Sequence, residues 1–141
     1  MPMHNLRRLC ALVFALVLVA GCSASQDTTA AKEQVSHFRE LMSGQQFGQI
    51  YSEASDDLKK TAREQEFVNL LSAIDRKLGP MKTAADNGWK VDFNTAGTTI
   101  TLSFKTEFER GTGVETFVYR MRDGRPLLAG YHINSNALVV N

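Results

Sequence analysis

The spacing of apolar and polar residues divides the chain into three stretches. Residues 9–20 are uniformly apolar, residues 31–78 carry apolar side chains at intervals of three or four, and residues 89–133 alternate apolar with polar side chains. Intervals of three or four residues place apolar side chains on one face of a helix, whereas alternation places them on one face of a strand. The pattern therefore predicts helices first and a sheet after them.

Three helices are expected before the alternating stretch. The first ends at Gly44, and the second covers residues 47–58, where polar residues near the middle predict a bend or a break. The third has the spacing of a capping box at Thr61 and Glu64 and is stopped by Gly79-Pro80. The apolar faces of the first and third helices consist of Ala31, Val35, Phe38 and Met42, and of Phe67, Leu70, Leu71, Ile74 and Leu78.

Four strands are expected in the alternating stretch, over residues 89–93, 100–108, 117–121 and 127–133. Turn residues separate them at Asn94 to Gly97, at Gly111 to Gly113 and at Asp123-Gly124. Strands joined by such short turns pair antiparallel and can present one apolar face. Because only the helical stripes can cover that face, the predicted fold class is α+β, with N-terminal helices packed on a four-stranded antiparallel sheet.

This arrangement resembles the cystatin-like fold in its nuclear-transport-factor-two-like form, and in particular small uncharacterised bacterial lipoproteins with such a domain. Residues 47–58, 67–79 and 130–135 carry the resemblance. It implies a curved sheet wrapped around helices, but it informs the fold far more than the function, because one fold houses many functions. The expected core joins Phe38, Phe67, Trp89, Phe104, Phe108 and Phe117.

The N-terminus has the features of a secretory signal. Arg7 and Arg8 precede the apolar run, which is shorter than the roughly 18 to 20 residues that a membrane-spanning helix needs. The run closes with Val19-Ala20-Gly21-Cys22, which resembles the lipobox of bacterial lipoproteins. The resemblance implies cleavage before Cys22, attachment of a diacylglycerol to its thiol, and acylation of the new N-terminus by palmitate or a similar chain. Ser23 follows where an aspartate would mark inner-membrane retention, so the expected location is the outer membrane, facing the periplasm.

Three segments follow from these patterns: a signal peptide over residues 1–21, the lipidated cysteine with a short polar tether over residues 22–29, and one α+β domain over residues 30–141. An extended tether of seven residues spans only about 25 Å, so the domain should stay close to the membrane surface. Residues 30–141 are enough for a single core without disulfides.

Cleavage alters the composition that bears on function. The chain has 16 basic and 15 acidic residues, and loss of Arg7 and Arg8 leaves 14 basic residues against the same 15 acidic ones. Such a nearly neutral protein lacks the basic footprint of a nucleic-acid-binding protein. With Cys10 removed and Cys22 acylated no thiol remains, which excludes disulfides, thiolate metal sites and cysteine catalysis.

Candidate catalytic chemistry is sparse. His37 and His132 lie on different elements without ligand spacing, so neither a metal site nor another cofactor is expected. The sequence contains no nucleophile elbow, phosphate loop or zinc motif. Asp56-Asp57 could be paired catalytic carboxylates, but a solvated bend is the preferred interpretation. Because the fold also houses isomerases and dehydratases with an acid and a base in an interior cone, the residues that could act there are Tyr51, Asp75, Tyr119, Tyr131 and His132.

The outward face of the sheet mixes both charges with small hydroxyls, and it is either an ordinary solvated face or a docking surface. The function predicted from the second interpretation is non-enzymatic: a periplasmic lipoprotein that binds a protein partner, as an adaptor or as an immunity protein against an antibacterial toxin. The alternative is a small-molecule-binding or isomerase-like domain, which needs an open apolar cavity of about 300 Å³ or more with a polar group such as Asp75 or Tyr119. The candidate partner-binding residues are Lys90, Lys105, Glu107, Arg120 and His132.

Overall fold

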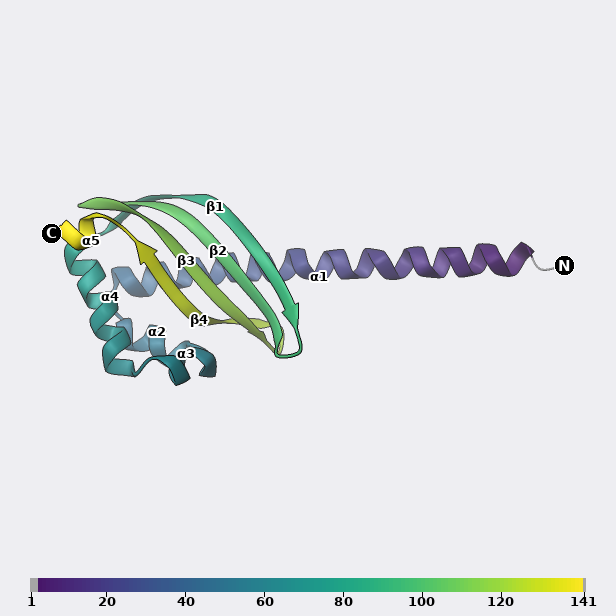
Figure 1. Ribbon diagram of the computed structural model, residues 1–141, viewed down its shortest axis with the longest axis horizontal. Helices are drawn as coiled ribbons and strands as arrows, with labels where there is room; N and C mark the ends of the chain where they lie inside the picture. Colours follow the sequence, from purple (N-terminus) through teal and green to yellow (C-terminus); the bar gives the residue numbers. More distant parts are fainter. Residues whose placement is uncertain (1–2, 141) are drawn as a thin grey trace.

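A computed structural model describes the backbone of residues 3–140 and the side chains of residues 23–140. Helices come first and a four-stranded antiparallel sheet follows, in the strand order β1-β2-β3-β4. Figure 1 shows the sheet curving over the helices, which confirms the predicted α+β class. The strands are β1 (Met81–Asn94), β2 (Gly97–Phe108), β3 (Gly111–Arg122) and β4 (Arg125–Asn134).

The helices are α1 (Met3–Ser43), α2 (Phe47–Glu53), α3 (Asp56–Thr61), α4 (Glu64–Leu78) and the short C-terminal α5 (Ala137–Val140). The predicted signal segment and Cys22 lie outside the residues whose side chains are described. In the described part of the chain, no helix combines the length and the apolar character needed to cross a membrane.

The segment predicted as a tether is helical. Residues 23–29 continue α1, and the hydroxyls of Thr28 and Thr29 donate to the carbonyl oxygens of Ala24 and Ser25 at 2.8 and 3.0 Å. These short polar side chains bond within the helix and so are compatible with it, although the segment lacks an apolar face of its own. A helix rises about 1.5 Å per residue, so the seven residues span about 10 Å and not the 25 Å of an extended tether.

The predicted break in the second helix is confirmed between α2 and α3. Ser55 caps α3 by accepting a hydrogen bond from the backbone of Leu58 at 3.4 Å, and its own backbone N–H donates to the carbonyl oxygen of Leu128 at 2.9 Å. The break therefore joins the helical layer to β4.

Helix α4 begins two residues later than the predicted capping box. Arg63 is its N-cap, and its backbone N–H donates to Glu66 at 3.4 Å. Thr61 cannot cap α4 because it still belongs to α3, where its hydroxyl donates to the carbonyl oxygen of Leu58 at 3.0 Å. The apolar face is as predicted except for Leu70, which is exposed. At the other end Gly79 adopts a φ of 72° that favours glycine.

The core lies between α1, α2, α4 and the concave face of the sheet. Phe38 and Phe104 contact Phe117 with ring centroids 5.1 and 5.9 Å away, and Phe67 is buried in the same cluster. Phe108 packs with Ile74 and Leu78 in a second, smaller cluster.

Trp89 was wrongly predicted to be in the core. Its side chain faces the same side of the sheet as its partner Leu102, yet it is 63% exposed. The reason is its position on β1, the edge strand, because α1 packs against β2, β3 and β4.

Candidate functional site

A buried ion pair lies on the concave face of the sheet. Glu115 on β3 is paired with Phe104 on β2, which places its carboxylate on the side that faces the helices. Arg39 on α1 reaches it with 3.1 Å between Nη2 and Oε2, and the two side chains are 20% and 4% exposed. Charged side chains are rarely buried so deeply unless they are paired, and a pair of this kind is a candidate for function.

The carboxylate of Glu115 has further partners. Thr106 donates its hydroxyl to Oε2 at 2.5 Å, and Tyr131 donates its hydroxyl to Oε1 at 2.9 Å. Burial, followed by the charge of Glu115, raises the pKa of Tyr131 well above its usual value, so this hydroxyl keeps its proton at neutral pH. The guanidinium of Arg39 also lies 4.7 Å from the ring centroid of Phe104. Both charged groups are therefore held in fixed positions.

A hollow of about 430 Å³ opens beside this pair; we call it the concave pocket. It lies where the end of α1 and the start of β1 approach the C-terminal half of α4, and side chains of both polar and apolar character line it. The apolar ones are Phe38, Met42, Pro80, Met81 and Phe108, and the polar ones are Ser36, Arg39, Glu40, Ser43, Asp75, Glu115 and Tyr131.

Negative charge exceeds positive charge in the concave pocket. Its lining contains the carboxylates of Glu40, Asp75 and Glu115 but only the guanidinium of Arg39, which Glu115 already pairs. Asp75 accepts a hydrogen bond from Gln45 at 3.0 Å, and neither Asp75 nor Glu40 forms an ion pair with any side chain among residues 23–140. Arg110 lies nearby but does not line the concave pocket; its guanidinium donates to the backbone carbonyl oxygens at the end of α4 at 2.7 and 3.1 Å.

The structure brings only part of the predicted interior set together. Asp75 and Tyr131 line the concave pocket, but Tyr51 donates its hydroxyl to the carbonyl oxygen of Ala62 at 2.9 Å, away from it. Tyr119 is 2% exposed, and its hydroxyl has no hydrogen-bond partner in the described structure. Burial raises the pKa of Tyr119 far above its usual value, so this group does not titrate near neutral pH.

Arg39 and Glu115 were missed by the sequence analysis. Glu115 was detectable, because it occupies the same alternating position on its strand as Phe117 and Tyr119, which point inward. Arg39 follows Phe38 on the first helix, and nothing in its spacing distinguishes it from a solvated side chain.

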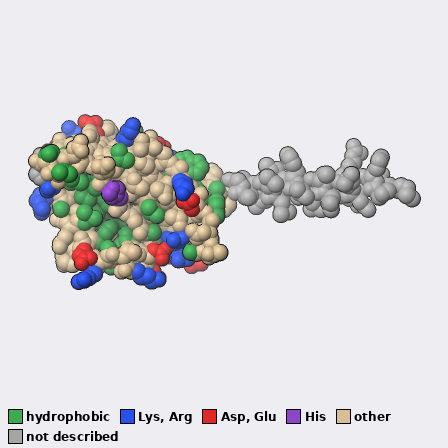
Figure 2. All heavy atoms as spheres, viewed as in Figure 1, with side chains coloured by type: hydrophobic (Ala, Val, Ile, Leu, Met, Phe, Trp, Pro, Cys, Tyr) green, Lys and Arg blue, Asp and Glu red, His purple; other side chains and the backbone are tan. Residues whose placement is uncertain are grey.

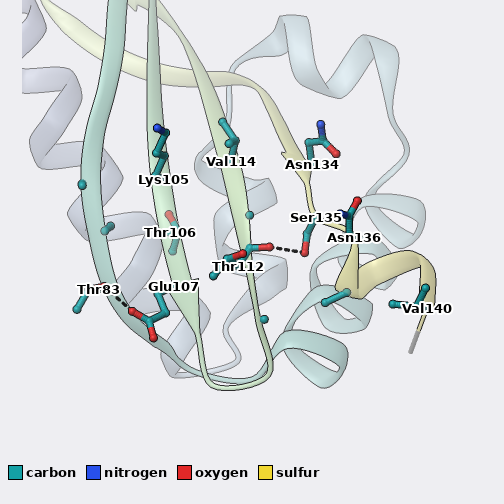
Figure 3. A pocket seen from close by; sticks show the side chains of 15 residues that line it. Thr83, Lys105, Thr106, Glu107, Thr112, Val114, Asn134, Ser135, Asn136 and Val140 are labelled. Atoms are coloured by element: carbon teal, nitrogen blue, oxygen red, sulfur yellow. Dashed lines mark hydrogen bonds between the residues drawn. The ribbon is translucent and has the colours of Figure 1, made fainter.

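The outward face of the sheet holds a second hollow, the outward groove, of about 870 Å³ (Figure 3). Lys105 and Glu107, predicted as partner-binding residues, both line it, together with Asn134 and the start of α5. Glu107 accepts a hydrogen bond from Thr83 at 3.3 Å. Lys105 is exposed and forms no ion pair with another described side chain.

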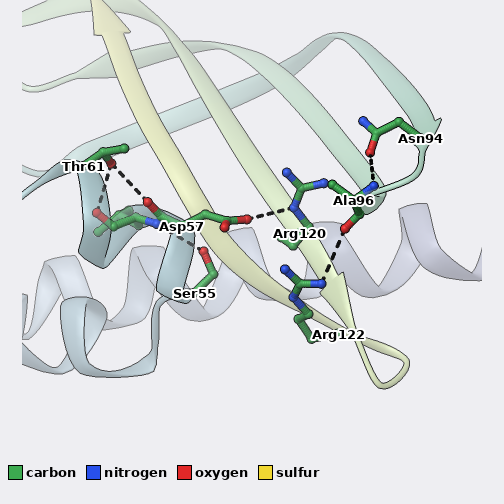
Figure 4. Close-up of polar contacts among 8 residues, drawn as sticks. Ser55, Asp57, Thr61, Asn94, Ala96, Arg120 and Arg122 are labelled. Atoms are coloured by element: carbon green, nitrogen blue, oxygen red, sulfur yellow. Dashed lines mark hydrogen bonds and ion pairs between the residues drawn. The ribbon is translucent and has the colours of Figure 1, made fainter.

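The other three predicted partner-binding residues lie apart from this groove. Arg120 forms an ion pair with Asp57 on α3 at 2.9 Å and is only 18% exposed, so it is not a free surface charge (Figure 4). Its alternation with Tyr119 did place it on the outward face, but its long side chain turns back to α3. Lys90 pairs with Asp92 at 2.8 Å, and His132 is exposed on β4.

The described residues provide no cluster of three His, Cys, Asp or Glu side chains that could hold a metal ion. His37 contacts Glu53 at 2.8 Å on the surface. In the view of Figure 2, basic and acidic side chains are interspersed around the margin of the domain.

Comparisons with known proteins add no identification, since no protein-family model matches the chain and no curated protein is significantly similar to it.

Proposed function

We propose that this chain is a lipid-anchored periplasmic protein of the outer membrane whose domain binds a small amphipathic cation in the concave pocket. The observation that supports the ligand is a hollow lined by both apolar and polar side chains, in which carboxylates outnumber cations, next to a buried ion pair. The observation that supports the anchor is the sequence from Arg7 to Cys22.

The size and lining of the concave pocket suit a small molecule. Ligand sites typically measure 300 to 1,000 Å³, combine apolar walls with a few polar groups, and are largely formed in advance. The hollow of about 430 Å³ falls within that range. Met42 and Phe108 would contact the apolar part of a ligand, and methionine adapts readily to different shapes.

The charge of the concave pocket favours a cation. Because Glu115 pairs with Arg39, the lining is left with the carboxylates of Asp75 and Glu40, which have no ion-pair partner among the described side chains. A positively charged group gains from both carboxylates, whereas an anion of the same shape would be repelled by them. A primary or substituted amine on an apolar body fits this environment best.

The arrangement supports binding better than catalysis. A general base needs a free lone pair within hydrogen-bonding distance of the proton that it removes. The carboxylate of Glu115 already accepts from Arg39, Thr106 and Tyr131, and its side chain is only 4% exposed, so it offers little surface to a bound molecule. We therefore propose that Glu115 and Arg39 shape the pocket and do not transfer protons.

Three probes of one shape test the ligand class: 3-phenylpropylamine, 3-phenylpropanol and 3-phenylpropanoate, titrated by calorimetry at low ionic strength. We expect the amine to bind most tightly and the carboxylate most weakly. Asp75→Asn should reduce the preference for the amine, and Met42→Trp should weaken all three by filling the hollow. Asp123→Asn removes an equal charge at a distant turn and should change nothing. Equal binding of the amine and the carboxylate, or unchanged binding to Met42→Trp, would contradict the proposal.

A second candidate function is the docking of a protein partner, as an adaptor or as an immunity protein, on the outward groove. Its support is the open hollow of about 870 Å³ in which Lys105 and Glu107 lie together. Affinity capture from periplasmic extract with Lys105→Glu and Glu107→Lys proteins tests it, because reversed charges should abolish recovery of a specific partner. Arg120→Glu is unsuitable for this purpose, since it would place two carboxylates together at Asp57.

A further inference from the structure

Two large aromatic side chains are exposed on the edge strand β1. Trp89 is 63% exposed and Phe93 is 69% exposed. They are four residues apart, with Val91 between them, so all three side chains point to the same face of the strand. Val91 packs against the core, whereas the side chains of Trp89 and Phe93 on either side of it remain largely exposed.

This pair of aromatic residues, the aromatic edge, is held in place by the backbone. A register shift between Asp86 and Gly88, with a φ of 131° at Gly88, sets which β1 residues share the face of Trp89. Beyond Phe93, the side chain of Asn94 accepts from the backbone of Ala96 at 2.9 Å, and Arg122 on β3 donates to the carbonyl oxygen of Ala96 at 3.5 Å (Figure 4). The turn after the aromatic edge is therefore fastened to the sheet.

The aromatic edge lies at the end of the domain from which α1 leaves. Figure 1 shows α1 passing beyond the sheet on the side of the turn between β1 and β2. Lys32 on α1 forms an ion pair with Asp86 on β1 at 2.7 Å, so these two residues mark a point where the two elements approach each other. From there Cys22 is ten residues away along a helix, about 15 Å, and Phe93 is seven residues away along a curved strand, about 23 Å at most. Both paths lead towards the end of the domain where α1 leaves the sheet (Figure 1).

From this placement we infer that the aromatic edge is a membrane-contact surface, which seats the domain on a phospholipid bilayer once Cys22 is acylated. Tryptophan prefers the boundary between lipid and water, where its ring is buried and its indole N–H stays hydrated. The neighbouring charges do not oppose this contact, since Lys90 and Asp92 point to the other face and pair with each other at 2.8 Å. The anchor keeps the surface near the bilayer, so a weak intrinsic affinity is sufficient.

The inference rests on the proposed anchor, and Trp89 provides the readout because the chain contains a single tryptophan. Full-length protein purified from cells is reconstituted into vesicles of phosphatidylethanolamine and phosphatidylglycerol, and mass spectrometry of its N-terminal peptide reports acylation. We expect Trp89 emission to shift to shorter wavelength, brominated lipids to quench it, and acrylamide quenching to fall severalfold relative to the free indole. Phe93→Ser should restore much of the acrylamide quenching. Val139→Ser alters another exposed apolar residue, on α5 at the opposite end of the domain, and should have no effect.

The outcomes separate the membrane contact from the anchor. Acylated protein whose Trp89 is quenched by acrylamide but not by brominated lipids would overturn the membrane contact and leave the anchor standing. Protein without acylation whose Trp89 is still quenched by brominated lipids would support the contact and overturn the anchor. Trp89 shielded from both quenchers would show that a second copy of the chain covers the aromatic edge, which also overturns the inference.

Discussion

Removal of one member of the buried ion pair should cost far more stability than removal of an exposed one. Glu115→Gln leaves the charge of Arg39 without a carboxylate, and Arg39→Met leaves Glu115 with only two hydroxyl donors. Breaking a buried pair costs about 3 to 5 kcal/mol, because one charge stays buried without compensation. Since Arg39 is 20% exposed, we expect the lower end of that range, about 3 kcal/mol for either variant. For a domain of this size the melting temperature would fall by about 10 °C.

The double variant distinguishes a coupled pair from two independent contributions. With both charges gone no buried charge remains unpaired, so Arg39→Met with Glu115→Gln should lose less stability than the two single losses added together. We expect a coupling of about 2 kcal/mol. Met retains much of the apolar stem that packs against Phe104, which limits the contribution from lost packing.

Urea unfolding followed by far-ultraviolet circular dichroism is the suitable assay, because Trp89 is already 63% exposed and its fluorescence would report unfolding poorly. The control is Asp86→Asn, which breaks an ion pair whose side chains are 42% and 64% exposed. Exposed pairs contribute less than about 1 kcal/mol. Single losses below 1 kcal/mol at Arg39 and Glu115, or losses that add without coupling, would refute the reasoning.

Four further predictions concern other groups. Tyr119→Phe should stabilise the protein by about 1 kcal/mol because it removes a buried hydroxyl without a partner in the described structure. Tyr131→Phe should destabilise it by about 1 to 2 kcal/mol because it removes the hydrogen bond to Glu115. Both effects are measured by urea unfolding, and the opposite order would contradict the assigned contacts. Phe104→Ala should cost about 3 to 5 kcal/mol in the same assay, and a loss below 1 kcal/mol would remove this residue from the core. Cys22→Ser should release the protein from the membrane fraction because it removes the thiol that would carry the lipid, and a variant that stays membrane-bound and uncleaved would contradict the lipid anchor at this position. The hydrogen bond from Arg120 lowers the pKa of Asp57, so the stability that this carboxylate contributes is present above about pH 4 and is lost as the pH falls further. The stability of Asp57→Asn should therefore depend less on pH below pH 4. An unchanged acid dependence would contradict the pairing.

The fold was predictable because its elements are defined by local patterns. The apolar stripe of α4 follows the helical period and the alternation of β2 follows the strand period. The residues that are buried in each element lie at positions that the pattern indicates. Strand β1 was predicted from Trp89 onward, but it begins at Met81. Residues 81–88 are exposed throughout and carry no alternation, so pairing with β2 and not local sequence determines their strand conformation.

The candidate site was harder to predict because its residues meet only in three dimensions. Arg39 and Glu115 are 76 residues apart, and the pair depends on α1 lying against β3. Asp75 and Tyr131 could be nominated as side chains that the fold might direct inward, but not assigned to a pocket. The same limitation affected Trp89, whose exposure follows from the edge position of its strand and not from the residues around it.

The continuity of α1 has a mechanical consequence. The helix that would carry the anchor at Cys22 also contributes Ala31, Val35, Phe38 and Leu41 to the core, with no flexible joint between residues 23 and 43. A pull on the membrane end would therefore load the packed interior directly, in shear along the helix axis, and a rotation of the helix would turn the whole domain with it. The helix and the domain would therefore move as one rigid body, and the openings of the two hollows keep fixed directions relative to the axis of α1.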